Sequence, residues 1–210
     1  MKESRFHIEQ QDVIWYQPLL DEQTVRRQGG VPEYVDFTQG IAHFTTDYHP
    51  NYGIINYGEH FSPPMDLMGD ITIEMYIRPD NYGLGCGSMC KILRNGEFAI
   101  GLATDNGPWG GNEKCVWATS NETTYPDSGD DSIVLNEWVN IILTRTVAGI
   151  MNFYLDGVLT GTANQDGGAP DAPNDDLVIV DDFHFIGDID YVMIYNRILT
   201  VSEIENLNDV

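Results

Sequence analysis

The sequence has few basic residues and no long apolar run. Of its 210 residues, 10 are Lys or Arg and 33 are Asp or Glu, so the formal net charge at pH 7 is −23. A surface with this excess of negative charge repels nucleic acids and anionic lipids, so neither is an expected partner. No run of about 18 apolar residues occurs, so insertion into a membrane is not expected either.

Export signals and paired cysteines are also scarce. The first twenty residues lack a basic flank followed by an apolar segment, so no N-terminal signal peptide is expected. The three cysteines, Cys86, Cys90 and Cys115, are odd in number and have no zinc-binding spacing. We favour free thiols in a protein made in a reducing cytoplasm. A disulfide joining Cys115 to Cys86 or to Cys90 is the alternative.

Short apolar runs separated by Gly and Pro make up most of the sequence, which is typical of strands joined by turns. Before Thr200 there is no sustained helical period of 3.6 residues. About ten short strands are therefore expected, as in a sandwich or jelly roll. Residues 70–79 alternate most clearly, with apolar side chains on one predicted face and polar ones on the other: Ile71, Ile73, Met75 and Ile77 against Thr72, Glu74, Tyr76 and Arg78.

Three strand pairings follow from the spacing of these runs. Residues 97–104 and 114–120 are predicted to be neighbours across a turn-rich segment. Residues 137–146 and 151–163 flank a short connection at Ala148-Gly149, which predicts a hairpin. The N-terminal run at residues 12–20 is predicted to pair near the last strand.

The C-terminal segment is the most regularly patterned part of the chain. Strict alternation predicts Ile189, Tyr191, Met193 and Tyr195 on one face of a strand, with Val192 and Ile194 on the other. Apolar residues on both faces indicate a strand that is covered on both sides. A carboxylate within such a strand, Asp190, needs hydrogen bonds or a cation.

A short helix is predicted after this strand. Thr200 and Glu203 form a T-x-x-E capping box. Val201, Ile204 and Leu207 then recur on one narrow apolar face. We expect this helix to cap an open end of the core.

Four segments resemble the concanavalin A-like lectin/glucanase superfamily, and specifically its laminin G-like jelly-roll domains. The terminal motif is residues 187–204, from Gly-Asp-Ile-Asp-Tyr-Val to Glu-Ile. Before it come residues 71–79, with Tyr76 where Trp is more usual, a strand anchored by Trp138, and a hairpin at Asp156-Gly157. The resemblance covers about residue 52 to residue 207, and residues 1–50 are assigned to N-terminal strands or an arm.

The resemblance implies one domain over residues 1–210: an all-β, antiparallel β-sandwich (jelly roll) with a short C-terminal helix. Trp138 is then expected to be a core residue, and Asp156-Gly157 to supply the positive φ of a tight hairpin. Asp190 either anchors backbone amides at its turn or binds one structural calcium ion, as in many relatives.

The superfamily includes glucanases and lyases, so catalysis needs a separate test. Their E-x-D-x-E type of strand is absent, and retaining hydrolysis requires two carboxylates about 5–5.5 Å apart. Residues 71–79 hold a single acid, Glu74, and none of the five histidines is spaced H-x-H or H-x-x-x-H. We predict that the protein is not an enzyme.

A binding site is predicted instead in residues 105–127, which are rich in Gly, Asn and aromatic residues. Aromatic faces and amide groups are suited to sugars. Glycan or partner binding is therefore assigned to Trp109, Asn112, Trp117 and Tyr125, with an intersubunit contact or packing within the loop as alternatives.

These observations leave two principal hypotheses for function. The first is a structural or adhesive component of an assembled particle, most simply a phage virion. It would be made in the host cytoplasm, join other virion proteins as an oligomer on capsid or tail, and bind host glycans. The second is a free carbohydrate-binding lectin, calcium dependent and exported without a signal peptide. A glycoside hydrolase or lyase is the weaker alternative.

Overall fold

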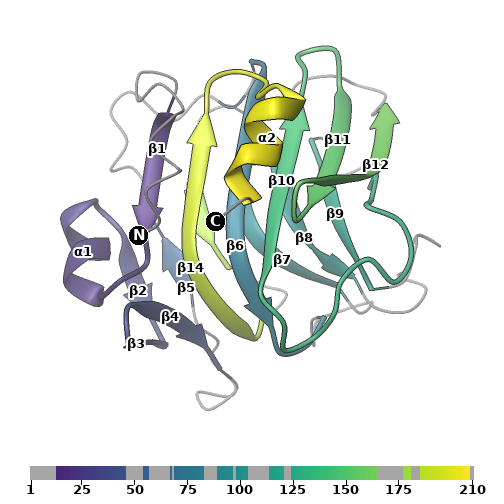
Figure 1. Cartoon of the computed structure of the whole chain (residues 1–210). Coiled ribbons are helices and arrows are strands. Elements are labelled where there is room, and N and C mark those ends of the chain that lie inside the picture. Colours follow the sequence, from purple (N-terminus) through teal and green to yellow (C-terminus); the bar gives the residue numbers. More distant parts are fainter. Residues whose placement is uncertain are drawn as a thin grey trace.

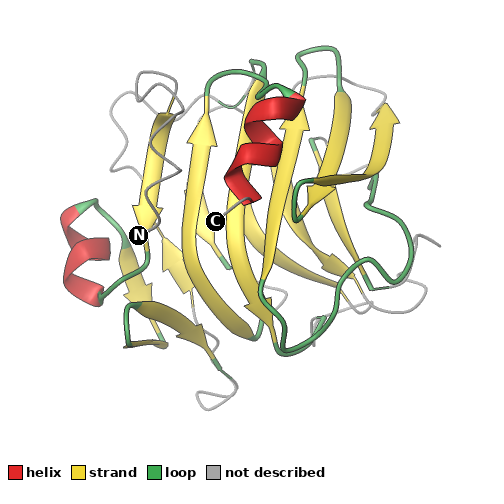
Figure 2. Ribbon diagram, in the orientation of Figure 1, coloured by secondary structure: helices red, strands yellow, loops and turns green. Residues whose placement is uncertain are grey.

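The protein is an antiparallel β-sandwich of the jelly-roll type, with two short helices (Figures 1 and 2). This description rests on a computed structural model. It covers residues 13–45, 54–56, 67, 69–82, 89–96, 98–103, 114–120, 124–164, 177–180 and 185–208.

The larger sheet has eight of the described strands, in the order β12-β11-β10-β6-β14-β4-β3, with β1 also paired to β14. Their bounds are β1 (Val13–Pro18), β3 (Val35–Thr38), β4 (Ile41–Phe44), β6 (Ile71–Pro79), β10 (Val139–Arg145), β11 (Ile150–Leu155), β12 (Val158–Asn164) and β14 (Gly187–Tyr195).

The smaller sheet lies behind it in Figure 1 and has six of the described strands, in the order β2-β5-β13-β7-β8-β9. Their bounds are β2 (Val31–Glu33), β5 (Ile54–Asn56), β7 (Met89–Asn95), β8 (Phe98–Ala103), β9 (Cys115–Thr119) and β13 (Leu177–Ile179).

The main core fills the space between the two sheets. The predicted apolar face of β6 is buried there, as are alternate residues of β10, β8 and β9. All three predicted pairings are confirmed, since β8 pairs with β9, β10 with β11, and β1 with β14. The hairpin at Asp156-Gly157 is also confirmed, with φ values of 47° and 75°.

A β-bulge in β14 changes which residues share a face. Ile189 pairs with Ile77 and Tyr191 with the adjacent Tyr76, so Asp190 is the extra residue between them. Ile189 therefore joins Val192 and Ile194 in the core. The predicted placement of Ile189 beside Tyr191 is wrong, because strict alternation holds only where no residue is inserted.

Helix α2 (Val201–Asn208) has the predicted start but not the predicted position. It lies on the outer face of the larger sheet (Figure 1), not at an open end of the core. The outer faces of β10, β11 and β14 carry apolar side chains that need cover, and Ile204 and Leu207 supply it. The resulting second cluster holds Ile142, Tyr154, Tyr195, Leu199, Ile204 and Leu207. Val201 is 56% exposed and takes no part.

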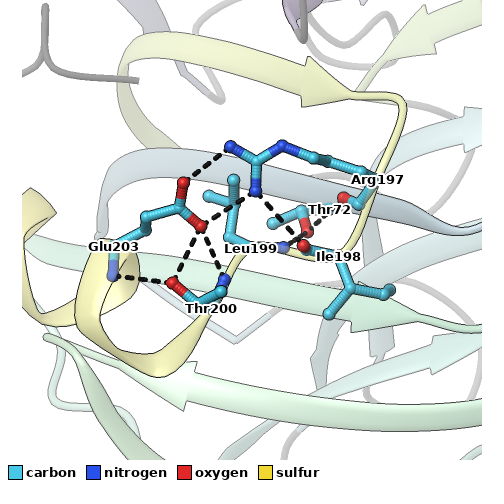
Figure 3. Close-up of polar contacts among 6 residues, drawn as sticks. All are labelled: Thr72, Arg197, Ile198, Leu199, Thr200 and Glu203. Carbon is cyan, nitrogen blue, oxygen red and sulfur yellow. Dashed lines mark hydrogen bonds and ion pairs between the residues drawn. The ribbon is translucent and has the colours of Figure 1, made fainter. Parts of the chain in front are cut away.

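The capping box of α2 is confirmed and is larger than predicted (Figure 3). Thr200 N donates to Glu203 Oε2 at 2.7 Å, and Glu203 N donates to Thr200 Oγ1 at 3.3 Å. Arg197 adds a bidentate pair to the Glu203 carboxylate, at 2.8 and 2.6 Å. Thr72 of β6 holds this turn on the sheet, since its hydroxyl donates to the Arg197 carbonyl and accepts from Leu199 N.

Helix α1 (Glu22–Arg27) was not predicted. Its N-cap is Asp21, whose carboxylate accepts from Thr24 N at 2.7 Å and has a lowered pKa because of that bond. With six residues the helix is shorter than two turns, so it produces no recognisable 3.6-residue period. In the residues that are described, no helix is long and apolar enough to cross a membrane.

Cys90 and Cys115 are both buried free thiols. The predicted free state is therefore confirmed for these two, and both disulfide alternatives are wrong, because each used Cys115. Burial raises the pKa of each thiol to about 12. Cys86 lies outside the described residues.

Candidate binding site

Four aromatic side chains cross the outer face of the larger sheet, beside the area that α2 covers. The ring centroids of Tyr16 and Tyr191 are 6.3 Å apart, those of Tyr191 and Tyr76 are 6.1 Å apart, and those of Tyr76 and Trp138 are 4.8 Å apart. Tyr76 lies nearly parallel to Tyr191 and to Trp138, at 27° and 22°. We call these four residues the aromatic row.

The row follows from strand register. Tyr76 and Tyr191 are directly opposed across β6 and β14, and Tyr16 comes from the next strand, β1. Trp138 immediately precedes β10, whose first residue, Val139, faces the core. Alternation then turns Trp138 outward, where it is partly exposed. The prediction that Trp138 is a core residue is wrong for this reason.

A charged pair lies next to the aromatic row. Asp188 of β14 is opposite Arg78 of β6, and its carboxylate is only 5% exposed. Arg78 Nη2 donates to Asp188 Oδ2, and His43 Nδ1 of β4 contacts Asp188 Oδ1. The other ring nitrogen, His43 Nε2, is 3.2 Å from the carbonyl oxygen of Thr38. Three strands therefore fix the position of this carboxylate.

Arg78 connects the charged pair to the aromatic row. Its guanidinium carbon is 5.8 Å from the ring centroid of Trp138, within the range of a cation–π contact. The side chain is 39% exposed, and its Nε is buried without an acceptor. The buried Nε is out of reach of a ligand, but the exposed part of the Arg78 side chain lies beside an aromatic surface, which is an arrangement suited to a polar ligand.

Glu74 lies under the row and is fully buried. Its carboxylate accepts hydrogen bonds from Tyr191 at 2.6 Å, Tyr195 at 2.8 Å and Asn140 Nδ2 at 3.3 Å. These bonds compensate for the loss of water around the carboxylate and fix the Tyr191 ring. Because Glu74 is not accessible, its geometry suits support of the row and not attack on a substrate. The Asn140 Oδ1 atom beside it is buried and has no hydrogen-bond partner.

The site predicted from sequence is described only in part. Trp117 and Tyr125 are brought together, with ring centroids 5.5 Å apart at 68°. Trp117 is 3% exposed, and its Nε1 donates to the Leu102 carbonyl at 2.9 Å, so its ring is a packing element on the outer face of the smaller sheet. Trp109 and Asn112 lie outside the described residues.

Asp190 is a bulge residue whose carbonyl oxygen accepts from Leu19 N at 2.8 Å. Across the described ranges, no three His, Cys, Asp or Glu side chains gather as a metal centre. The structural calcium ion stays a prediction.

Sequence reasoning missed the charged pair and most of the aromatic row. The alternation in residues 70–79 does place Tyr76 and Arg78 on the outer face. His43 and Asp188 are 145 residues apart, so only the fold brings them together.

The chain belongs to the concanavalin A-like lectin/glucanases superfamily, because the profile of that family matches residues 56–205. This confirms the family resemblance of the C-terminal motifs. No curated protein sequence matches the chain.

Several solved structures share the fold. The binding domain of paraclostridial mosquitocidal protein 1 is 14% identical with a TM-score of 0.71, over 95% of this chain and 52% of that one. The binding domain of botulinum neurotoxin DC, in complex with rat synaptotagmin II, is 14% identical with a TM-score of 0.64, over 95% and 51%. This chain thus spans about half the length of either toxin structure.

A third structure is similar over nearly its whole length. It is domain 4 of an extracellular arabinanase from Geobacillus stearothermophilus, in complex with arabinotriose. The identity is 16% and the TM-score 0.58, over 94% of this chain and 98% of that one. At these identities the likeness extends to the fold alone.

Proposed function

We propose that the protein is a non-catalytic, lectin-like module that binds a glycan on the outer face of its larger sheet. The observation that carries the proposal is the aromatic row with Arg78 and Asp188 beside it. The partly exposed rings of Tyr16, Tyr76 and Trp138 offer apolar area to the C–H faces of a sugar, and the buried Tyr191 supports them from within the row. The exposed part of Arg78 offers a hydrogen-bond donor for hydroxyl groups.

The relatives support a binding role in general terms. The arabinanase domain was solved with arabinotriose, and one similar botulinum neurotoxin structure concerns entry through two ganglioside molecules. In the synaptotagmin complex, a neurotoxin binding domain with this fold is bound to a protein. Because one relative is part of a hydrolase, the lack of catalysis in this chain is also a proposal, which the burial of Glu74 supports.

The virion hypothesis rests on expectations from the sequence, among them the fold, the acidic composition and the free cysteines, and it gains no support from these relatives. Assembly with other virion proteins and oligomerisation stay predictions, as does the localisation. Sedimentation velocity would contradict the oligomer if the purified chain is a stable monomer at micromolar concentration.

The test is a glycan array followed by titration calorimetry on the best ligand, with calcium and with EDTA. Trp138→Ala should weaken binding by at least about tenfold, as expected for truncating a central aromatic contact. Tyr34→Ala is the matched control, since Tyr34 is 41% exposed and belongs to neither candidate site. Tyr125→Ala tests the site predicted from sequence.

Each result has a consequence. A silent array in both conditions refutes the proposed function. Loss of binding in Tyr125→Ala but not in Trp138→Ala moves the site to the smaller sheet. Equal binding in EDTA contradicts the calcium-dependent form of the hypothesis and the metal role of Asp190.

A further inference from the structure

We propose that this site selects neutral oligosaccharides and rejects acidic ones, an inference that rests on the proposed glycan-binding function. Three features of the site support this selectivity: its hydrogen-bonding groups, the charge around them, and the extent of the aromatic row.

The groups at the site match hydroxyls better than anions. Arg78 supplies a donor, since its charged side chain is 39% exposed. Asp188 acts through its charge, because its side chain is 5% exposed and is already contacted by Arg78 and His43. A neutral sugar hydroxyl can accept a hydrogen bond from Arg78 without bringing a negative charge close to Asp188. A carboxylate or sulfate offers only acceptors and would face the Asp188 oxygens unfavourably.

The charge around the site also opposes an anion. Asp188 already balances the guanidinium charge of Arg78. Glu74 adds a buried carboxylate whose three hydrogen-bond donors, from Tyr191, Tyr195 and Asn140, are all neutral groups. The whole chain adds a formal net charge of −23. An acidic sugar therefore meets repulsion at long range, and at the site the charge of Arg78 is already balanced by Asp188.

The aromatic row favours an oligosaccharide over a single sugar. Its members come from β1, β14, β6 and the start of β10, so the row spans three strand spacings of about 4.8 Å, or roughly 14 Å. This length exceeds one sugar ring. Tyr191 is only 1% exposed, so ligand contacts fall to the partly exposed Tyr16, Tyr76 and Trp138. A chain of several neutral sugars can contact these three side chains, while the exposed part of Arg78 orients one sugar.

The experiment compares neutral and acidic ligands of matched size by calorimetry at pH 8. One pair is lactose and 3′-sialyllactose, and another is galactotriose and trigalacturonate, with arabinotriose and cellotriose as further neutral probes. Each is titrated at about 20 mM and about 500 mM NaCl, conditions between which the Debye length falls severalfold.

At low salt we expect at least one neutral oligosaccharide to bind about tenfold or more tightly than every acidic ligand. Added salt should change neutral binding by less than about twofold and should strengthen any acidic binding, since it screens repulsion. This series uses the wild-type protein, so it does not depend on a variant that folds. Acidic ligands that bind as tightly as neutral ones at low salt would overturn the inference while leaving the proposed function intact.

Two variants locate the selectivity. Asp188→Asn removes the repelling carboxylate and should raise the ratio of acidic to neutral affinity by about tenfold, the effect of one unpaired charge at this range. Arg78→Gln should weaken neutral binding without raising that ratio. An unchanged ratio in a folded Asp188→Asn protein would place the selectivity elsewhere. If no ligand of either class binds the wild type, the proposed function itself fails.

Discussion

Replacing Glu203 with Gln should destabilise the folded protein by about 1–2 kcal/mol at neutral pH, and the loss should disappear in acid. The wild-type carboxylate accepts two hydrogen bonds from Arg197 and two from Thr200 (Figure 3). Gln keeps one acceptor oxygen for the capping box but loses the ion pair. The variant therefore isolates the charge-dependent part of the interaction.

The magnitude follows from the pKa of this group. Hydrogen bonds from Arg197 lower the pKa of Glu203 from 4.5 to about 2. A difference of about 2.5 units sets an upper limit of ~3.4 kcal/mol, at about 1.36 kcal/mol per unit. Because the Arg197 and Glu203 side chains are 30% and 29% exposed, solvent screening reduces this limit to about 1–2 kcal/mol.

The direction of the Glu203 pKa shift determines the pH range over which this carboxylate stabilises the folded protein. A carboxyl group whose pKa is lower in the folded state stabilises the protein fully above its unfolded pKa, and that contribution is lost as the pH falls through the folded pKa. The difference between wild type and Glu203→Gln should be complete above about pH 5.5 and should vanish near pH 2. Urea denaturation at a series of pH values measures it.

The matched control is Glu22→Gln in α1, which removes a more exposed ion pair with Arg26. Those two side chains are 58% and 51% exposed. The cost should be no more than about 0.5 kcal/mol. A Glu203→Gln difference that is independent of pH, or one no larger than that of Glu22→Gln, would refute the reasoning.

Three further predictions concern packing. Gly101→Ala should lower the free energy of unfolding, measured by urea denaturation, by more than about 3 kcal/mol, because a Cβ would lie 1.7 Å from the Cys90 carbonyl oxygen. The control is Gly69→Ala, which should lower it by less than about 0.5 kcal/mol, because a Cβ there would have nothing within 4 Å. In a variant without the third cysteine, Cys90 and Cys115 should react with a thiol reagent at pH 8 only on unfolding, because burial raises both pKa values to about 12; fast labelling of the folded protein would contradict this. Deleting Asp190 should preserve the near-ultraviolet circular dichroism spectrum, because the bulge residue is the one without a counterpart on β6; a collapsed spectrum would contradict that role.

Most of the fold could be predicted because its signals are local. Alternation along β6 and the Asp-Gly hairpin each depend on neighbouring residues, and both are confirmed. The bulge at Asp190 left no such signal, so the face of Ile189 was predicted wrongly. The position of α2 could not be predicted from local pattern either, because it depends on which face of the sheet carries apolar side chains that no other element covers.

The candidate site could be predicted only in fragments, for a related reason. Its charged pair comes from β6 and β14 and is contacted by His43 of β4, and no spacing in the sequence relates His43 to Asp188. Trp138 illustrates the opposite error. Its size suggested a core residue, yet its position just before Val139 places it on the outer face, stacked on Tyr76. Residue type alone does not distinguish an aromatic residue that fills a core from one that forms a surface.

The C-terminal motif that defines the family also supports the aromatic row. Helix α2, fixed by its capping box, buries the ring of Tyr195, whose hydroxyl donates to Glu74. The same carboxylate accepts from Tyr191, whose ring packs against Tyr76 at the centre of the row. The buried carboxylate of Glu74 thus links Tyr195, which α2 covers, to Tyr191 in the aromatic row. The position of the aromatic row therefore depends on the packing of α2 against the sheet, although no α2 side chain belongs to the row itself.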